Sequence, residues 1–313
     1  MNATATTLTL TNDLLTGSEW SSAQTRELFH LAAEIKSRPE KFRSALAGRI
    51  LALIFEKPSL RTRVSFEAGI ASLGGASIFL DHTASHLGER EPIHDVARCL
   101  ERWVHGIVAR VFAQESLDEL AANSRVPVIN ALSDQFHPCQ ALADFFTLEE
   151  RFGGLRGLKF AYVGDGNNMC HSLLLAGART GAHLRIATPA GFEPTAAIVA
   201  EAKRAARETR GKIEILRSPE DAVAGAQAVY TDVWTSMGQE DESTAREAAF
   251  AGFQVNEELF ALAAPDAVFM HCLPAHRGLE VSEGMMNSPR SIVFDQAENR
   301  LHVQKAILLT LLN

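Results

Sequence analysis

The chain has 313 residues, of which 46% are hydrophobic and 22% are charged, enough to bury more than one domain-sized core. Its formal net charge of -8 and sequence pI of about 5.8 argue against a protein that holds nucleic acid through an extended basic face. Any anion that it binds is therefore expected to be small and held locally by a few groups.

The cysteines favour a reducing compartment. Cys99, Cys139, Cys170 and Cys272 lie far apart, without a CxxC pair and without the density of a secreted disulfide scaffold. Residues 1–17 lack the basic flank and long apolar run of an export or import signal. No apolar stretch reaches membrane-spanning length. We therefore expect a cytoplasmic protein that binds neither nucleic acid nor a membrane.

Short apolar runs typical of buried strands alternate with helical patterns along the chain. In order, the expected strands are Ile50–Phe55, Ser77–Leu80, Gly106–Val111, Pro127–Asn130, Leu158–Val163, Leu184–Ala187, Lys212–Leu216, Ala228–Thr231 and Val268–His271. This alternation is typical of βαβ units, in which parallel strands are covered by helices. The predicted fold class is therefore α/β, with mostly parallel sheets flanked by helices.

One long helical pattern divides the chain. It covers residues 137–152 and stops at Gly153-Gly154, after which a fresh strand begins. We place the domain boundary there, so that residues 1–152 form one domain and residues 153–294 a second, joined by the long helix. Residues 295–313 have the pattern of an amphipathic helix, which we expect to pack back on the first domain.

The segment Phe55–Arg63 combines the end of a buried strand with the start of a helix. Ser59 stands at the expected N-cap, so that the free backbone N–H groups of the first turn point outward. The hydroxyls of Ser59 and Thr62 and the guanidinium of Arg61 add donors suited to a phosphate dianion. The alternative is an ordinary capped helix with solvated arginines, although arginine in a first turn opposes the helix dipole.

A second polar cluster opens the long helix. Pro138 suits the first helical position, which puts His137 at the N-cap with its ring free to face a cleft, and Gln140 within the first turn. A histidine in such a place is, taken alone, more often structural than catalytic. Cys139 beside it raises a metal site as an alternative that we do not favour, and no metal is expected.

Two residues of the second domain stand where open parallel sheets place their ligands. Asp232 and Cys272 each follow directly on a predicted strand. Taken alone, Cys272 would be a buried inert cysteine, and with His271 and His276 it would make half of a zinc site that lacks a fourth ligand. The turn at Gly164–Met169 raises a dinucleotide site instead, but it lacks the third glycine and the acidic residue expected after the next strand.

Five motifs, taken in order, resemble those of the aspartate/ornithine carbamoyltransferase family. They are Ser59-Leu60-Arg61-Thr62-Arg63, Arg110 at a strand end, His137-Pro138-Cys139-Gln140, Asp232–Gly238 and His271-Cys272-Leu273-Pro274. The resemblance covers essentially the whole chain and implies an enzyme, without a cofactor, that transfers the carbamoyl group of carbamoyl phosphate. The last two motifs are similar to those of the branch that acts on L-ornithine and releases L-citrulline and phosphate.

The resemblance also assigns site residues. For carbamoyl phosphate it implies Ser59, Leu60, Arg61, Thr62, His86, Arg110, His137, Pro138, Cys139, Gln140, Cys272, Leu273 and Arg300. For ornithine it implies Asn168, Asp232, Ser236 and Met237. The residues that it implies to take part directly in catalysis are Arg61, Arg110, His137, Asp232 and Cys272. In the family pattern the histidine bonds the carbamoyl oxygen, and the aspartate bonds the side-chain amine.

The chain departs from the family pattern at two places. Leu60 replaces a frequent threonine, and His86 stands where relatives usually have a glutamine that reaches the phosphate site of a neighbouring subunit. The family suggests a homotrimer or trimer-based assembly with sites at the subunit interfaces, and the chain length favours arginine synthesis over breakdown. The alternatives are transfer to aspartate or to another amine and, more distantly, a nicotinamide-dependent dehydrogenase.

Overall fold

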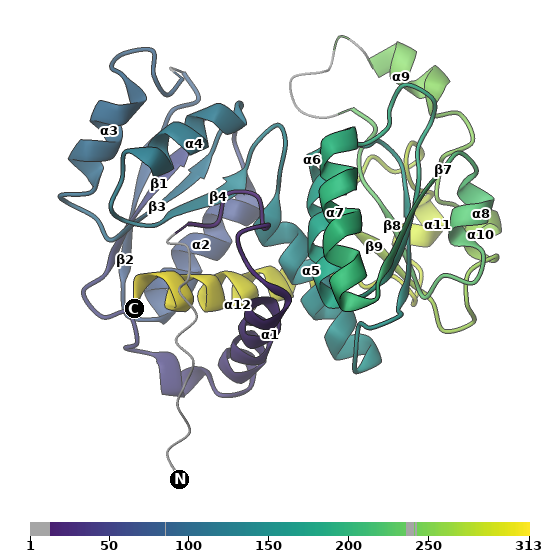
Figure 1. Cartoon of the computed structure of the whole chain (residues 1–313), viewed down its shortest axis with the longest axis horizontal. Helices are drawn as coiled ribbons and strands as arrows, with labels where there is room; N and C mark the ends of the chain where they lie inside the picture. Colours follow the sequence, from purple (N-terminus) through teal and green to yellow (C-terminus); the bar gives the residue numbers. More distant parts are fainter. Residues whose placement is uncertain (1–12, 85, 236–240, 242) are drawn as a thin grey trace.

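The computed structural model describes residues 13–84, 86–235, 241 and 243–313, which fold into two α/β halves that lie side by side (Figure 1). The first half contains a four-stranded parallel sheet of order β2-β1-β3-β4. Its strands are β1 (Ile50–Phe55), β2 (Ala76–Asp81), β3 (Gly106–Arg110) and β4 (Val128–Leu132). The predicted class is confirmed.

Helices cover both faces of this sheet because its strands are apolar on both sides. Leu53 and Phe55 of β1 face one cluster, and Ala52 and Ile54 between them face another, as the alternation of a strand requires. The first cluster includes residues of α1 (Ser22–Ser37) and α2 (Leu60–Ser72), and the second includes residues of α3 (Ile93–Leu100) and α4 (Gln114–Ala122). The short helix η1 (Pro39–Phe42) follows α1.

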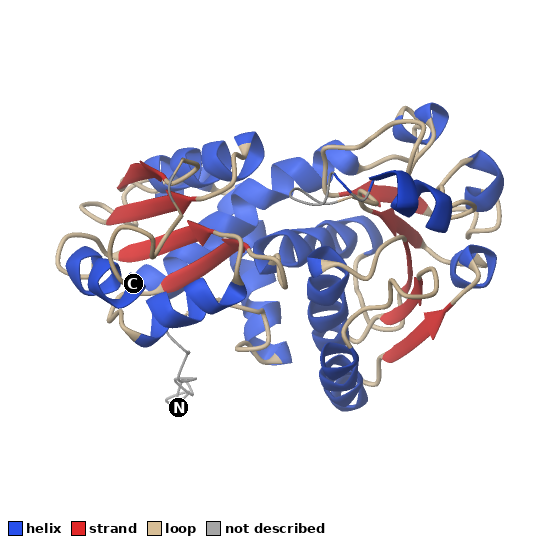
Figure 2. Ribbon diagram, turned by 90° about the horizontal axis from the view of Figure 1, so that it is seen from above, coloured by secondary structure: helices blue, strands red, loops and turns tan. Residues whose placement is uncertain are grey.

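The second half contains a five-stranded parallel sheet of order β7-β6-β5-β8-β9. Its strands are β5 (Lys159–Val163), β6 (His183–Ala187), β7 (Lys212–Leu216), β8 (Ala228–Thr231) and β9 (Val268–His271). Its helices are α6 (Asn168–Thr180), α7 (Ala196–Thr209), α8 (Pro219–Val223), α9 (Ser243–Ala249), α10 (Glu257–Phe260) and α11 (Glu283–Met286). Viewed from above, helices surround both sheets (Figure 2).

Two long helices join the halves. Helix α5 (Pro138–Phe152) ends at Gly153, whose φ of 72° suits a residue without a side chain, and its buried face packs against β4, α6 and α12. Helix α12 (Val293–Leu312) packs against α1, α2 and α5, which confirms its expected return to the first half. The domain limits 1–152, 153–294 and 295–313 stay a prediction.

In each sheet there is one point at which successive strands begin to be added on the opposite side. The first sheet is built outward from β1 to β2 on one side and from β3 to β4 on the other, and the second sheet reverses in the same way between β5 and β8. A crevice opens at the carboxyl ends of the strands at such a point. The loops after these strands are therefore the places where side chains of both halves can meet.

The expected strands are all present, with bounds that are unchanged or shift by at most two residues. Helix α9 begins at Ser243, and residues 236–240 and 242 before it lie outside the described part. In the described ranges, no helix is both long enough and apolar enough to cross a membrane.

Candidate active site

A cleft of about 900 Å³ lies where the carboxyl ends of the two sheets face each other. Its lining comes from the loops after β1, β3, β5, β8 and β9, from the start of α5, and from α12. The predicted residues that line it are Ser59, Leu60, Arg61, Thr62, Arg110, His137, Gln140, Asn168, Asp232, Cys272, Leu273 and Arg300. The fold thus brings together residues that are up to 241 positions apart, from Ser59 to Arg300.

The turn after β1 is built as the sequence predicts. Ser59 is the N-cap of α2, with extended backbone and an Oγ that accepts a hydrogen bond from the Thr62 N–H over 3.3 Å. Arg61 lines the cleft, whereas Arg63 points away, pairs with Glu67 at 3.0 Å and lies over an aromatic ring. The alternative of a solvated arginine therefore describes Arg63 and not Arg61.

Three guanidinium groups gather at the first-domain side of the cleft. Burial is the main cause that lowers the pKa of Arg61, of Arg300 and of Arg110, the last to about 10. The positive charges of Arg300 and Arg61 lower the pKa of Arg110 further. Cationic groups that repel one another in a buried site form a place prepared for a polyanion.

His137 stands at the N-cap of α5, with Pro138 at the first helical position, as predicted. Its backbone N–H donates to Ser172 Oγ of α6 over 2.7 Å, so that the second domain holds the start of this first-domain helix. Burial, followed by the charges of Arg300 and Arg110, brings the pKa of His137 well below its ordinary value. The imidazole is therefore neutral and can donate a hydrogen bond to a carbonyl oxygen without carrying charge.

Arg300 connects the phosphate turn to the long helix. It donates from Nη1 to Gln140 Oε1 over 2.8 Å and from Nη2 to Thr62 Oγ1 over 3.0 Å, and it is only 3% exposed. The side chains of Pro138 and Cys139 are buried and do not line the cleft, and the thiol of Cys139 donates to Asn130 O.

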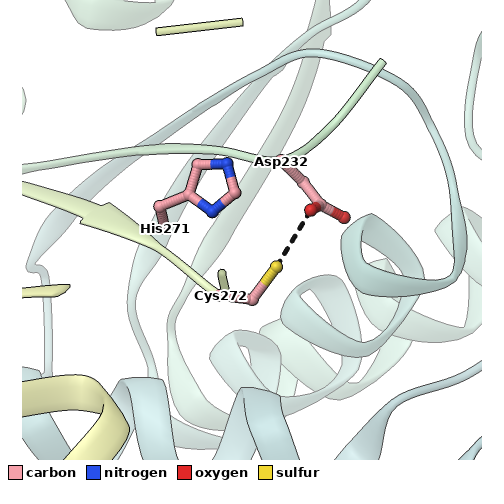
Figure 3. Close-up of side chains that lie close together, drawn as sticks. All are labelled: Asp232, His271 and Cys272. Carbon is pink, nitrogen blue, oxygen red and sulfur yellow. Dashed lines mark hydrogen bonds between the residues drawn. The ribbon is translucent and has the colours of Figure 1, made fainter. Parts of the chain in front are cut away.

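Asp232 and Cys272 lie next to each other on the second-domain side of the cleft, because their strands are in register (Figure 3). Thr231 and His271 are partners at the ends of β8 and β9, so the residues that follow them lie side by side. The thiol of Cys272 donates to Asp232 Oδ1 over 2.9 Å. Burial, and then the nearby carboxylate of Asp232, raise the pKa of Cys272 well above its ordinary value, so the group is a thiol at neutral pH.

Asp232, His271 and Cys272 also place potential metal-ligand atoms within 4.8 Å of one another. The imidazole of His271 is already engaged. Its Nδ1 accepts from the Leu273 N–H over 2.8 Å, and its Nε2 lies 3.3 Å from Glu280 Oε1. To bind here, a metal ion would have to break one of these hydrogen bonds of His271 and remove the proton of the Cys272 thiol.

The turn after β5 supplies two amides. Asn167 caps α6 through its Oδ1 and donates from Nδ2 to Asp232 Oδ2 over 2.9 Å. Asn168, the residue predicted to contact the substrate, donates from Nδ2 to Ser133 O of the first half over 2.7 Å. A side chain at Gly166 would place its Cβ 2.2 Å from Pro194 N, which explains the glycine in this turn.

Comparison with known proteins assigns the chain. Residues 12–150 match the family model of the aspartate/ornithine carbamoyltransferase carbamoyl-P binding domain, and residues 156–311 match that of its Asp/Orn binding domain. The chain belongs to the aspartate/ornithine carbamoyltransferase family.

Relatives within the aspartate/ornithine carbamoyltransferase family match over the full length. The ornithine carbamoyltransferase of Acidothermus cellulolyticus is 51% identical over 304 residues, which is 97% of this chain and 96% of the relative. That of Anoxybacillus flavithermus is 50% identical over 314 residues and covers 100% of both chains. The solved structure of ornithine carbamoyltransferase from Pyrococcus furiosus has a TM-score of 0.93 at 47% identity and covers 96% of each chain.

His86 lies beside the aspartate/ornithine carbamoyltransferase cleft and does not line it. Its ring is 49% exposed, contacts Phe112 edge-on at 4.9 Å, and has its Nδ1 4.0 Å from Glu56 Oε1. Glu56 is nearly buried and holds the loop by accepting from the Leu87 N–H over 2.7 Å. Ser236 and Met237, two predicted ornithine contacts, lie outside the described residues.

A buried ion pair that the sequence does not reveal lies at the cleft of this carbamoyltransferase-family fold. Arg246 of α9 donates from Nη1 to Asp165 Oδ2 over 2.7 Å and to Trp234 O over 2.9 Å. Burial raises the pKa of Asp165 to about 6, against the opposing charge of Arg246. No local sequence signal links these partners, which are 81 residues apart.

Proposed function

We propose that this protein transfers the carbamoyl group of carbamoyl phosphate to the side-chain amine of L-ornithine, giving L-citrulline and phosphate. One observation carries the proposal: three guanidinium groups and a neutral imidazole converge opposite Asp232 and Cys272 across a single cleft. A polyanion and an amine are the partners that such a pair of surfaces recognises. The full-length likeness to ornithine carbamoyltransferases supports it.

The first domain holds the carbamoyl phosphate. The Ser59–Thr62 turn, with the guanidinium of Arg61, binds the phosphate oxygens through backbone, hydroxyl and charged donors. Arg110 and His137 donate to the carbonyl oxygen, where negative charge develops as the amine attacks. Gln140 offers its Oε1 to the carbamoyl nitrogen. Leu60 and the backbone of Pro138 and Cys139 belong to the same proposed site, as do Cys272 and Leu273 from across the cleft.

The second domain presents the amine. An ornithine side chain has a pKa close to that of lysine, about 10.4, so the reactive neutral amine must be selected by the site. We assign Asp232 and the Leu273 carbonyl to the amine, and Asn168, Ser236 and Met237 to the amino-acid end. The amine nitrogen forms its bond to the carbonyl carbon, the bond from that carbon to the phosphate oxygen breaks, and phosphate leaves with its electron pair. The departing phosphate takes up the proton that the amine gives up.

The acceptor is tested by comparing amines directly. Ornithine, aspartate, N-acetylornithine and putrescine are each supplied with carbamoyl phosphate, and release of phosphate and the carbamoylated product are measured. We expect ornithine to give the highest kcat/KM, because the second-domain face offers Asp232 to an amine, and its arginine, Arg246, is already paired with Asp165. A clear preference for any of the other three acceptors would contradict the proposed substrate.

We propose a homotrimer or trimer-based assembly in which His86 reaches the phosphate site of a neighbouring subunit. Its support is the exposure of large apolar side chains on α2 and on the neighbouring strand β2, where Leu60, Val64 and Ile78 are 76%, 51% and 49% exposed. Sedimentation velocity is expected to give three chains of 34.0 kDa or a multiple of three. A monomer would contradict the assembly.

His86→Gln is expected to bind carbamoyl phosphate at least as tightly as the unchanged protein above neutral pH, since an amide donates at every pH.

We also propose that the reaction runs toward citrulline for arginine synthesis in the cytoplasm. The compact chain favours this direction. Rate measured against carbamoyl phosphate concentration is expected to follow a hyperbola, and a sigmoidal curve from a large assembly would instead favour arginine breakdown.

A further inference from the structure

A carboxylate that the proposed reaction does not use lies at the centre of the molecule. Asp144, in the middle of α5, is 0% exposed where α5, α12 and β8 meet. Its Oδ1 accepts from Gln140 Nε2 over 2.8 Å and from Gln296 Nε2 over 2.9 Å, and its Oδ2 accepts from the Tyr230 hydroxyl over 3.0 Å. Three donors from three elements thus converge on one carboxylate.

The two glutamines connect Asp144, through further hydrogen bonds, to opposite sides of the cleft. Gln140 Oε1 accepts from Arg300, whose other branch holds Thr62 of the phosphate turn. Gln296 Oε1 accepts from the backbone N–H of His271 over 3.0 Å, one residue before Cys272. Guanidinium and backbone N–H groups can only donate, and an ionised carboxylate can only accept. Each amide therefore has one orientation that satisfies both of its ends.

We propose that Asp144 is the positioning residue for both halves of the site, because its carboxylate fixes the amides of Gln140 and Gln296. The inference rests on the proposed function. On the first-domain side it aims an amide oxygen toward the cleft, where a carbamoyl nitrogen would need an acceptor. On the second-domain side it fixes the position of the end of β9, from which the thiol of Cys272 and the carbonyl of Leu273 project.

Stability alone does not account for a carboxylate in this place. Its three hydrogen-bond partners are neutral, and burial raises the pKa of Asp144 to about 6 against the opposing effect of those bonds. A buried carboxylate without a bonded cation costs folding free energy that a neutral side chain would avoid. Its acceptor-only character is what the two amides require.

The test compares Asp144→Ala and Asp144→Asn with a matched control in the same interface. The control is Thr147→Val, one turn further along α5, where the hydroxyl accepts from Asn299 of α12 over 3.0 Å and leads to no cleft residue. We expect Asp144→Ala to lower kcat/KM for both carbamoyl phosphate and ornithine by about 10–100-fold, the range found when outer partners of site groups are removed. Thr147→Val is expected to change neither by more than about twofold, although it loses a buried hydrogen bond of similar worth.

Asp144→Asn separates orientation from packing. Its oxygen can still accept from both glutamines, but its amide N–H donates where the Tyr230 hydroxyl already donates, so only part of the activity should return. If Asp144→Ala does not fold, Gln296→Met cuts only the second-domain branch. It is expected to reduce kcat/KM for ornithine by about tenfold and to leave the KM for carbamoyl phosphate within about twofold.

The outcomes are distinguishable. Unchanged protein that does not carbamoylate ornithine would reject the proposed function itself. If that activity is present, kinetics of Asp144→Ala equal to those of Thr147→Val would overturn the positioning role. A loss in Asp144→Ala confined to one substrate would overturn the claim that the carboxylate serves both halves, as would equal losses for both substrates in Gln296→Met.

Discussion

Cys272 and Asp232, forty positions apart in the sequence, share a hydrogen bond of 2.9 Å in which sulfur is the donor and the carboxylate the acceptor. The bond helps to keep the sulfur of Cys272 protonated. The carboxylate favours the neutral thiol over the thiolate, and the thiol occupies one oxygen of the carboxylate until a better donor, such as an amine, arrives.

The thiol form of Cys272 predicts slow alkylation. Only a thiolate attacks iodoacetamide at a useful rate, and both burial and Asp232 oppose its formation. At pH 8 we expect Cys272 to react at least about tenfold more slowly than Cys99, an exposed cysteine that serves as the internal control. Peptide mass spectrometry over time measures both. Equal rates would mean that Cys272 is already a thiolate.

Arg61 and Arg63 form a matched pair for testing the phosphate grip. Both belong to the first turns of α2, but about 200° separates their directions on the helix, and only Arg61 faces the cleft. Arg61→Gln is expected to lower kcat/KM for carbamoyl phosphate by about 10²–10³-fold, the usual effect of removing one donor from a developing charge. Arg63→Gln is expected to stay within about twofold, because it loses an exposed pair with Glu67. Similar losses in both variants would show that the arginines stabilise helix α2 and that the loss in Arg61→Gln is not specific to the cleft.

The Arg246–Asp165 pair predicts a double-mutant result. Its side chains are 9% and 10% exposed, so Arg246→Gln leaves a buried carboxylate without its cation. Such a break costs about 3–5 kcal/mol of unfolding free energy. Adding Asp165→Asn should recover part of this loss, because the uncompensated charge disappears with it. Urea unfolding of the four proteins in the cycle measures the coupling, and a double variant less stable than either single variant would contradict a direct pair.

Two buried carboxyl groups predict a steep loss of activity in acid. Burial raises the pKa of Asp144 and of Asp165 to about 6, so both gain protons as the pH falls through this value. Protonated Asp144 must donate where the groups facing it, Gln140, Gln296 and Tyr230, are already donating, and Arg300 stands beyond them as the nearby charge. Well above pH 6 both groups are carboxylates, and activity is expected to be level.

The two groups are separated by substitution. In the unchanged protein, the slope of log kcat/KM for carbamoyl phosphate against pH should be steeper on the acid side than a single ionisation gives. In Asp144→Asn this slope should fall to that of a single ionisation. Asp165→Asn should have the same effect on the slope. An unaltered profile in Asp144→Asn would show that some other group controls the acid side.

The sequence predicted those features that are set by neighbouring residues. The nine strands were recognisable because each is a short apolar run between turns, and Ser59 and His137 were correctly placed as N-caps because capping depends on the next few residues. The direction of Arg61 into the cleft follows from the same local geometry.

Contacts between distant segments could not be predicted in this way. Asp144 lies 86 residues from Tyr230 and 152 from Gln296, and its own helix offers only the Gln140 partner, four residues earlier, as a hint. Hydrophobic periodicity reports which face of an element is buried, but it does not report what a buried polar group meets there. The two amides and the ion pair at Asp165 become visible only when the tertiary fold is known.

The bond between Thr62 and Arg300 has a consequence for how the protein is made. These partners are 238 residues apart, so a ribosome that has finished the phosphate turn must still synthesise the whole second sheet before α12 can cover α2. During that interval the apolar faces that await α12 stay uncovered, and a chain stopped before residue 300 lacks the donor that connects Thr62 to Gln140. A nascent chain thus reaches its anion-binding form late in translation, after the whole of the second sheet has been made.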